Sequence, residues 1–234
     1  MLSKLLDLQK TSNSLEILRK VNKNIPERNF HEFTHILHDI RTLLGDEEKT
    51  YLEIGSYVGS SASLMLQHEF KTNILCVDPC VLPSSHYNGS LSQSETLQKN
   101  IANNNIHDYK VEIFRQYSTD TTLLNKLKQG NTKIDILFID GDHSRKGVIN
   151  DWNNFKDFVN PGGFICFDDY YDDIYSPEVR PAVDFIAQQL DTDKYEAIGS
   201  IENVHKLSDN PAEYKHPKFI NEFIIYKKQH INIK

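Results

Sequence analysis

The chain has 234 residues, of which 38% are hydrophobic and 25% charged, and its formal net charge at pH 7 is −7. A chain of this length buries roughly 70–75% of its unfolded surface and needs no disulfides to form one core. The acidic balance and the scattered Lys and Arg residues argue against nucleic acid as a partner, and no apolar segment approaches the ~20 residues of a membrane span.

Two parts of the chain differ in their hydrophobic pattern. Residues 1–48 have helical spacing of apolar residues and predict an N-terminal helical extension, which acts as a lid or as a dimer contact in a homo-oligomer. In residues 49–234, short runs of Ile, Val, Leu and Phe alternate with helix-length polar segments, which is typical of βα units and a parallel sheet. The predicted strands are Tyr51–Gly55, Ile74–Asp78, Val111–Gln116, Ile134–Asp140, Phe164–Asp168, Tyr195–Ile201 and Glu222–Lys227. The last two lack a helix between them, so we expect an antiparallel pair at one sheet edge.

The cysteine pattern bears on the cellular compartment. Cys76 and Cys166 fall inside predicted strands, and together with Cys80 the chain has three cysteines, an odd number. Buried, unpaired cysteines are typical of reduced intracellular proteins, so we expect a cytoplasmic protein.

Two of the predicted strands end abruptly in aspartates. They are the segments KIDILFIDGDH (Lys133–His143) and GFICFDDYYDD (Gly163–Asp173). Neighbouring parallel strands lie ~5 Å apart and present their carboxyl ends to the ligand crevice, so Asp140, Asp168 and Asp169 are expected to converge there. Converging carboxylates either repel one another or share a cation, which predicts a metal site.

A glycine-containing turn follows the first strand. Gly55 and Gly59 allow the backbone to turn tightly and to approach a ligand closely, and Asp78 ends the next strand. An acidic side chain at that position can accept both hydroxyls of a ribose. The turn lacks both GxGxxG and the phosphate-loop motif GxxxxGK[ST], so it suits adenosine without a pyrophosphate.

The combination of motifs at the strand ends resembles class I S-adenosylmethionine-dependent methyltransferases. The motifs are ExGxxxG after the first strand, an acid closing the second, D-G-D-H at the fourth, and P-G-G with D-D-Y at the fifth. The chain is most similar to the metal-dependent O-methyltransferases, the branch with macrocin and rhamnosyl O-methyltransferases and cephalosporin-hydroxylase-like proteins. The resemblance covers residues ~50–230. It implies a Rossmann-like α/β fold with a seven-stranded, mostly parallel sheet, the last strand antiparallel, and helices on both faces.

The resemblance also implies roles for individual residues. Asp140, Asp168 and Asp169 match the three metal ligands, Asp78 the ribose-binding acid, and Ser118 a neighbour of the adenine. The implied cofactor-binding residues are Glu53, Gly55, Ser56, Tyr57, Gly59, Ser60, Ser61, Asp78, Ser118 and Asp140.

The chemistry of these residues favours methylation of a hydroxyl. An all-aspartate set suits Mg²⁺ or another divalent, oxygen-liganded cation, which would lower the pKa of a bound hydroxyl. His143, three residues after Asp140, is the expected base, and Asp142 is its rival. The family's catechol-type members have lysine where this chain has His143. We therefore expect a Mg²⁺-dependent O-methyltransferase acting on a small molecule, with a hydroxyl of a sugar, glycan or similar polyol as acceptor.

Other residues near the predicted site have less specific interpretations. The segment Pro79–Ser94, with His86 and Tyr87 among small polar residues, is expected to cover the acceptor. Asp172 and Asp173 are interpreted as a solvated acidic loop, and Arg180 as a residue at the start of a surface helix.

Two alternative functions remain open at this stage. One is a fold relative that binds an adenosyl cofactor or a metal as a regulatory module without methylating. The other rests on His31-Glu32-Phe33-Thr34-His35, which satisfies the zinc-peptidase motif H-E-x-x-H. His38 lies one turn further on but does not match the extended metzincin pattern, and no downstream Glu lies on an obvious partner helix. We interpret the helix as packing on the domain, with the histidines at its border.

Overall fold

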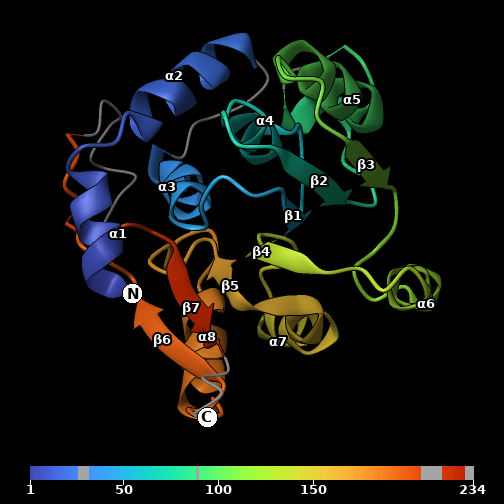
Figure 1. Ribbon diagram of the computed structural model, residues 1–234. Helices are drawn as coiled ribbons and strands as arrows, with labels where there is room; N and C mark the ends of the chain where they lie inside the picture. The colour runs from blue at the N-terminus through green and yellow to red at the C-terminus, as the bar shows by residue number, and fades with distance from the viewer. Residues whose placement is uncertain (26–31, 88–89, 207–217, 230–234) are drawn as a thin grey trace.

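A seven-stranded sheet with the order β3-β2-β1-β4-β5-β7-β6 forms the centre of the molecule (Figure 1). The computed structural model describes residues 1–25, 32–87, 90–206 and 218–229. The strands are β1 (Lys49–Ile54), β2 (Thr72–Val77), β3 (Val111–Phe114), β4 (Ile134–Ile139), β5 (Val159–Phe167), β6 (Tyr195–Gly199) and β7 (Phe223–Lys227). Strands β1 to β5 are parallel, whereas β7 runs antiparallel to both β5 and β6. The predicted mostly parallel sheet with a reversed last strand is confirmed.

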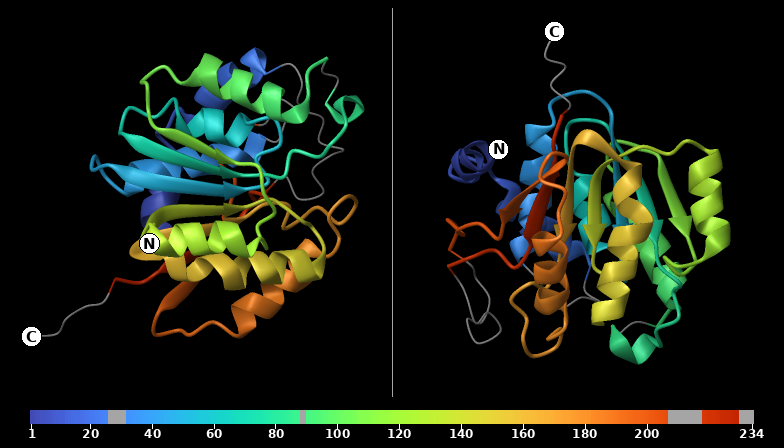
Figure 2. Two further views of the ribbon diagram at one scale, coloured as in Figure 1. Left: turned by 90° about the vertical axis from the view of Figure 1, so that its right-hand side faces the viewer. Right: turned by 90° about the horizontal axis from the view of Figure 1, so that it is seen from below.

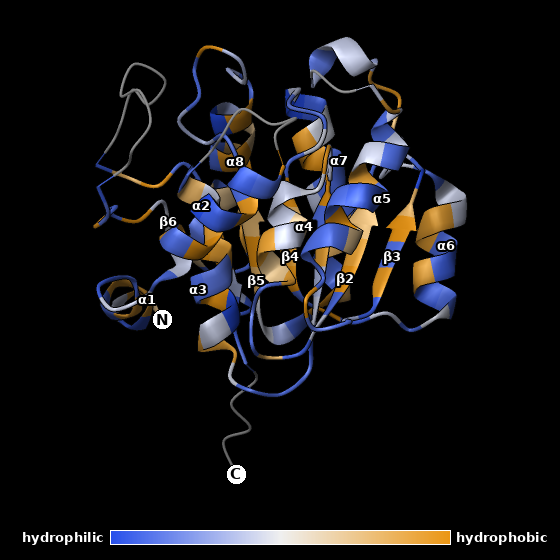
Figure 3. Cartoon of the chain, turned by 90° about the horizontal axis from the view of Figure 1, so that it is seen from above, coloured by the Kyte–Doolittle hydropathy of each residue, from blue (hydrophilic) through white to orange (hydrophobic). Residues whose placement is uncertain are grey.

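Helices cover both faces of this sheet (Figure 2). The α-helices are α1 (Leu2–Gln9), α2 (Ser14–Asn24), α3 (Ile36–Leu43), α4 (Ser60–Met65), α5 (Gln93–Asn104), α6 (Thr121–Gln129), α7 (Arg145–Phe155) and α8 (Val179–Gln188), with 3₁₀ turns η1 (Glu32–His35), η2 (Ser84–His86) and η3 (Lys156–Phe158). Helices α6, α7 and α8 pack on one face, and α1, α3, α4 and α5 on the other. Apolar strands therefore lie between two helical layers (Figure 3).

Alternation along the strands divides the core between the two faces. Leu137 and Ile139 of β4 join the cluster under α6, α7 and α8, whereas Ile136 and Phe138 join the opposite cluster. All four side chains are at most 4% exposed. Both faces of the strand are buried, and this explains why the sequence reads as a continuous apolar run.

Strand β5 begins at Val159, five residues before the predicted start at Phe164. The register with β4 shifts between Ile134 and Ile136, opposite the Pro161-Gly162-Gly163 segment. Gly162 has a φ of 92°, a left-handed conformation that favours glycine. The Pro-Gly-Gly sequence is therefore an irregularity inside a strand that begins earlier than predicted.

The N-terminal extension contributes to the main core. Ile36, Leu37 and Ile40 of α3 are fully buried in the same cluster as residues of the sheet. Its predicted role as a lid or a dimer contact stays a prediction. In the described ranges, no helix is both long and apolar enough to cross a membrane.

A buried acid in the extension leads to a stability prediction. Asp39 Oδ1 accepts a hydrogen bond from Ser12 Oγ at 2.5 Å, and Asp39 Oδ2 has no hydrogen-bond partner. Burial raises the pKa of Asp39 from 3.8 to about 6. Because the folded state favours the protonated acid, its contribution to stability is lost as the pH rises from about 4 to about 6. We expect Asp39→Asn to increase the free energy of unfolding at pH 8 by about 1–3 kcal/mol, which raises the melting temperature by a few degrees.

The measurement is thermal unfolding of both proteins between pH 4.5 and 8. The gain should shrink toward the acidic end, and the exposed Asp46→Asn control should show none. A gain that does not depend on pH would assign the effect to packing and not to the buried charge.

Candidate functional site

The predicted acidic residues meet at the carboxyl ends of β4 and β5. Asp140 directly follows β4, and Asp168 and Asp169 directly follow β5. The two strands pair up to their last residues, and the Asp168 backbone N–H donates to the Ile139 carbonyl at 3.0 Å. The segments after β2 and β5 extend from this same edge of the sheet (Figure 2).

Asp140, His143 and Asp169 form the tightest group at this edge. One ligand atom from each of these three residues lies within 4.8 Å of the others. Asp169 has a φ of 59°, and its carboxylate accepts hydrogen bonds from Ser176 Oγ at 2.6 Å and Asn221 Nδ2 at 3.2 Å. The turn after β5 thus aims the Asp169 carboxylate toward Asp140.

Histidine 143 lies between the two carboxylates. Its Nε2 is 3.2 Å from Asp140 Oδ1, and its Nδ1 is 2.7 Å from Ser176 Oγ and 3.4 Å from Asp169 Oδ2. Burial lowers the pKa of His143, but the hydrogen bond to Asp140 and the surrounding carboxylate charges outweigh it and raise this pKa to about 9. The imidazole therefore carries a proton at neutral pH and supplies positive charge to the group.

Asp168 lies outside this group of three. Its Oδ1 accepts a hydrogen bond from the Asp169 backbone N–H at 2.9 Å, and the side chain is 4% exposed. Burial, followed by the charges of Asp140 and Asp169, raises the pKa of Asp168 well above its ordinary value. Its role as a metal ligand stays a prediction.

This arrangement fits a divalent cation. Asp140 and Asp169 offer carboxylate oxygens, which Mg²⁺ and Ca²⁺ prefer, and His143 already holds a positive charge between them. Besides burial, the negative charges of Asp140 and Asp169 raise the pKa of Asp168, which is a second effect of the excess negative charge in this group. A cation held by Asp140 and Asp169 would relieve it.

The predicted glycine turn links β1 to α4. Gly55, Tyr57 and Gly59 all have positive φ values, of 89°, 48° and 87°. A Cβ on Gly55 would lie 1.8 Å from the backbone oxygen of Asp140. Glycine at this position thus allows the turn to pack directly against the residue that follows β4.

The predicted ribose acid is held at the base of this turn. Asp78 is 6% exposed, and its Oδ2 accepts a hydrogen bond from the Tyr57 backbone N–H at 2.8 Å. Its Oδ1 accepts from the Cys80 backbone N–H at 2.7 Å and from Gln93 Nε2 at 3.1 Å. These three donors fix the carboxylate beside the glycine turn.

Several predicted cofactor residues direct their side chains into the protein. Glu53 is fully buried, and its Oε2 accepts hydrogen bonds from Tyr51 O–H and Ser61 Oγ, each at 2.7 Å. Ser60 Oγ donates to Asn22 Oδ1 on α2 at 2.9 Å. Ser56 is 2% exposed. These side chains therefore hold the turn in place from the inside, and the cofactor roles predicted for Glu53, Ser56, Ser60 and Ser61 stay predictions.

Ser118 follows β3 and forms a hydrogen bond with Asp151, a buried acid on α7. Its Oγ donates to Asp151 Oδ1 at 2.5 Å, and burial raises the pKa of Asp151 to about 6. A Cβ on Gly141 would lie 3.3 Å from Asp151 Oδ2, so this acid also borders the turn after β4. The turns after β3 and β4 are thereby connected.

The remaining sequence motifs lie apart from the acidic group or outside the described residues. Arg180 pairs with Asp173 at 2.7 Å, and not with the acidic group. His31 of the H-E-x-x-H motif lies outside the described residues. Glu32 is buried in an ion pair with Arg19 at 2.6 Å, and burial lowers the pKa of His35 to about 4. The described part of the motif therefore gives the zinc-peptidase alternative no support.

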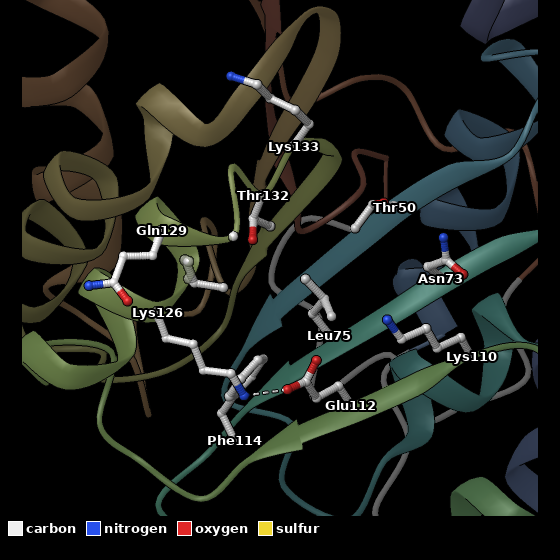
Figure 4. Close-up of a pocket in the computed structure, with 12 residues that line it drawn as sticks. Thr50, Asn73, Leu75, Lys110, Glu112, Phe114, Lys126, Gln129, Thr132 and Lys133 are labelled. Carbon is white, nitrogen blue, oxygen red and sulfur yellow. Dashed lines mark hydrogen bonds and ion pairs between the residues drawn. The ribbon is translucent and has the colours of Figure 1, made fainter.

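A separate hollow of about 560 Å³ lies near the amino ends of the strands (Figure 4). Thr50, Asn73 and Lys110 line it from the sheet, and Lys126 closes one side through its ion pair with Glu112 at 2.6 Å. It lies toward the end of the strands opposite Asp78 and Asp140. The hollow is therefore not part of the candidate site.

Sequence reasoning missed the residues that hold the site in place. Ser176 and Asn221 orient Asp169, Gln93 contacts Asp78, and Asp151 contacts Ser118. Asn221 is 52 positions from Asp169 along the chain, and no local motif marks it.

A family model described as a methyltransferase domain matches residues 52–170, just over half of the chain. The chain belongs to this methyltransferase family. An uncharacterized protein of Acanthamoeba polyphaga mimivirus is 37% identical over 212 residues, which cover 88% of this chain and 91% of that protein. The sequence-based prediction of an S-adenosylmethionine-dependent methyltransferase is confirmed.

Solved structures with the same fold are much more distant in sequence. The methyltransferase chain is similar to the O-methyltransferase TomG of Streptomyces achromogenes, solved in complex with S-adenosylmethionine, with 14% identity, a TM-score of 0.58, and coverage of 93% of this chain and 91% of that one. It is also similar to an rRNA methylase of Streptococcus thermophilus, with 12% identity, a TM-score of 0.56, and coverage of 86% and 100%. These likenesses confirm the fold.

The close approach of Gly55 to Asp140 generates a prediction. We expect Gly55→Ala to cost several kcal/mol of stability, because its Cβ would meet a backbone oxygen that cannot move aside. Gly45→Ala is the matched control: its φ of 78° is also left-handed, but nothing lies within 4 Å of its Cβ, so we expect only about 1–2 kcal/mol. Urea unfolding measures both. Equal costs would mean that the contact with Asp140 has no energetic importance.

Proposed function

We propose that this methyltransferase moves a methyl group from S-adenosylmethionine to a hydroxyl of a sugar or similar small polyol, with Mg²⁺ as the second cofactor. The observation that carries the proposal is the group formed by Asp140, His143 and Asp169 directly beside the glycine turn. An adenosyl cofactor and a cation-held hydroxyl would then be neighbours. TomG, whose structure was solved with S-adenosylmethionine, supports the cofactor assignment.

The cofactor half of the proposed site consists of the glycine turn, Asp78 and Ser118. Asp78 would bind the ribose hydroxyls, Ser118 would lie beside the adenine, and the turn from Gly55 to Gly59 would border the methionine portion. Methyl transfer then needs the acceptor oxygen ~3–3.5 Å from the methyl group and in line with the departing sulfur. The close packing of Gly55 on Asp140 suits this proximity.

In the metal half, Asp140 and Asp169 would hold the cation, with Asp168 as the further predicted ligand. When bound, Mg²⁺ would polarise the acceptor hydroxyl and neutralise the carboxylates. With that charge neutralised, the pKa of His143 would return toward its ordinary value, and the imidazole would be able to take the hydroxyl proton. Asp142 is the alternative base; its Oδ1 accepts a hydrogen bond from the Ser144 backbone N–H at 3.0 Å at the start of α7.

Exposed apolar side chains favour a second candidate acceptor, a phenolic hydroxyl. Tyr175 is 83% exposed and Ile174 is 55% exposed. They immediately precede Ser176, which donates a hydrogen bond to Asp169. Val81, after β2, is 64% exposed. Tyr87, which we expected to cover the acceptor, is instead 1% exposed and packs against Val58. These observations weaken the sequence argument for a sugar and fit an aromatic acceptor.

A small molecule remains the proposed partner, although the fold alone does not exclude nucleic acid. The rRNA methylase has the same fold, but the net charge of −7 disfavours a nucleic-acid surface on this chain. Cys76, Cys80 and Cys166 are free thiols, which supports the proposed cytoplasmic location.

Methyl transfer from labelled S-adenosylmethionine tests the proposal on matched panels of sugars, polyols and phenols, with Mg²⁺ or EDTA. We expect transfer to one of these classes and its loss in EDTA. His143→Gln should lower kcat ~10²–10⁴-fold, whereas Asp142→Asn, which keeps an acceptor for the Ser144 N–H, should change it less than threefold.

A larger loss of kcat in Asp142→Asn than in His143→Gln would identify Asp142 as the base. Full activity in EDTA would contradict Mg²⁺ dependence. Binding of the adenosyl cofactor or of the metal without any transfer would instead favour the fold relative that binds one of them and does not methylate.

A further inference from the structure

Gln93, at the first position of α5, forms hydrogen bonds with the glycine turn and with two positions at and after the end of β2. Its Nε2 donates to Asp78 Oδ1 at 3.1 Å and to the Tyr57 carbonyl at 3.3 Å. Its Oε1 accepts from the Leu82 backbone N–H at 2.9 Å. The side chain is 1% exposed, so water does not compete for these bonds.

The start of α5 holds Gln93 firmly. Ser92 and Glu95 form a capping box: Ser92 Oγ accepts from the Glu95 backbone N–H, and Glu95 Oε2 accepts from the Ser92 backbone N–H at 2.9 Å. The box fixes the backbone on both sides of Gln93. The amide therefore acts as a fixed donor and acceptor.

The segments that Gln93 joins are also connected to one another. Tyr57 donates its backbone N–H to Asp78 Oδ2 at 2.8 Å and its hydroxyl to the His86 carbonyl at 2.8 Å. The Tyr57 and Tyr87 rings are in edge contact, with centroids 6.1 Å apart. The glycine turn, the Asp78 carboxylate and the segment Cys80–Tyr87 thus make one connected unit.

We infer that Gln93 is a positioning residue for the Asp78 carboxylate and ties it to the segment Cys80–Tyr87, so that the ribose acid and this segment are placed together. The inference rests on the proposed function, in which Asp78 binds the ribose. Gln93 acts through Asp78 and needs no contact with the cofactor. The amide suits both connections because one end donates and the other accepts.

Gln93→Glu separates the two connections. The introduced carboxylate still accepts from the Leu82 N–H, but it cannot donate to Asp78 and repels it. We expect affinity for S-adenosylhomocysteine to fall about 10-fold or more at pH 8, and to recover partly near pH 5.5, where two adjacent carboxylates share a proton. Wild-type affinity should change much less over this range. Isothermal titration calorimetry measures both, and Gln98→Glu, at an exposed glutamine of the same helix, is the matched control.

Gln93→Ala removes both connections. Hydrogen exchange of residues 80–87 without any ligand should become several-fold faster than in wild type, whereas Gln98→Ala should stay close to wild type. This arm does not depend on the proposed function. If the wild-type protein does not bind S-adenosylhomocysteine, only the ribose role of Asp78 is overturned. The hydrogen-exchange result still tests whether Gln93 holds the segment Cys80–Tyr87.

The inference is overturned if Gln93→Glu binds S-adenosylhomocysteine within twofold of wild type at pH 8. It is also overturned if the loss in this variant is the same at pH 5.5, or if Gln93→Ala leaves the exchange of residues 80–87 unchanged. A merely structural role would lower the melting temperature without the recovery at acidic pH.

Discussion

The repulsion among the carboxylates at the ends of β4 and β5 is the constraint on which the site depends. At ~4 Å, two unit charges repel by about 4 kcal/mol at an effective dielectric constant of 20. Strand pairing brings Asp140 and Asp168 side by side, and the turn after Asp168 directs Asp169 back toward Asp140. A carboxyl that keeps its proton reduces this repulsion, in the direction shown by the raised pKa of Asp168. Positive charge within the group reduces it further. Protonated His143 supplies that charge in the protein alone, and a divalent cation would supply it in the enzyme that we propose.

The glycine turn lies against this acidic group at the same edge of the sheet. The strand order reverses between β1 and β4, which is where ligands bind in open α/β sheets. Gly55 directly follows β1 and Asp140 directly follows β4, and the missing Cβ of Gly55 allows their backbones to pack closely. Transfer between two ligands needs this closeness, because alignment of donor and acceptor supplies much of the rate. The close packing of Gly55 on Asp140 is what the two-part site that we propose requires.

The strands and the acids that end them were predictable because their signals are local. An apolar run stopped by an aspartate identifies both the strand and its tip, as at Asp140 and Asp168. The supporting contacts were not predictable, because they depend on residues far apart in sequence, such as Asn221 beside Asp169. The inward direction of Glu53 was also missed. Both sheet faces are covered by helices, so a buried polar side chain is possible on either face when partners such as Tyr51 and Ser61 are present.

Titration of Mg²⁺ into the protein at pH 8, by calorimetry in buffers of different ionisation enthalpy, tests the central claim most directly. The account predicts one site per chain and release of up to one proton on binding, because a cation beside Asp140 and Asp169 lowers the pKa of His143 from about 9. Asp169→Asn should weaken binding at least ~10-fold, and His143→Gln should lower the proton release. Undetectable binding to the wild-type protein, or equal binding to the Asp169 variant, would contradict the account.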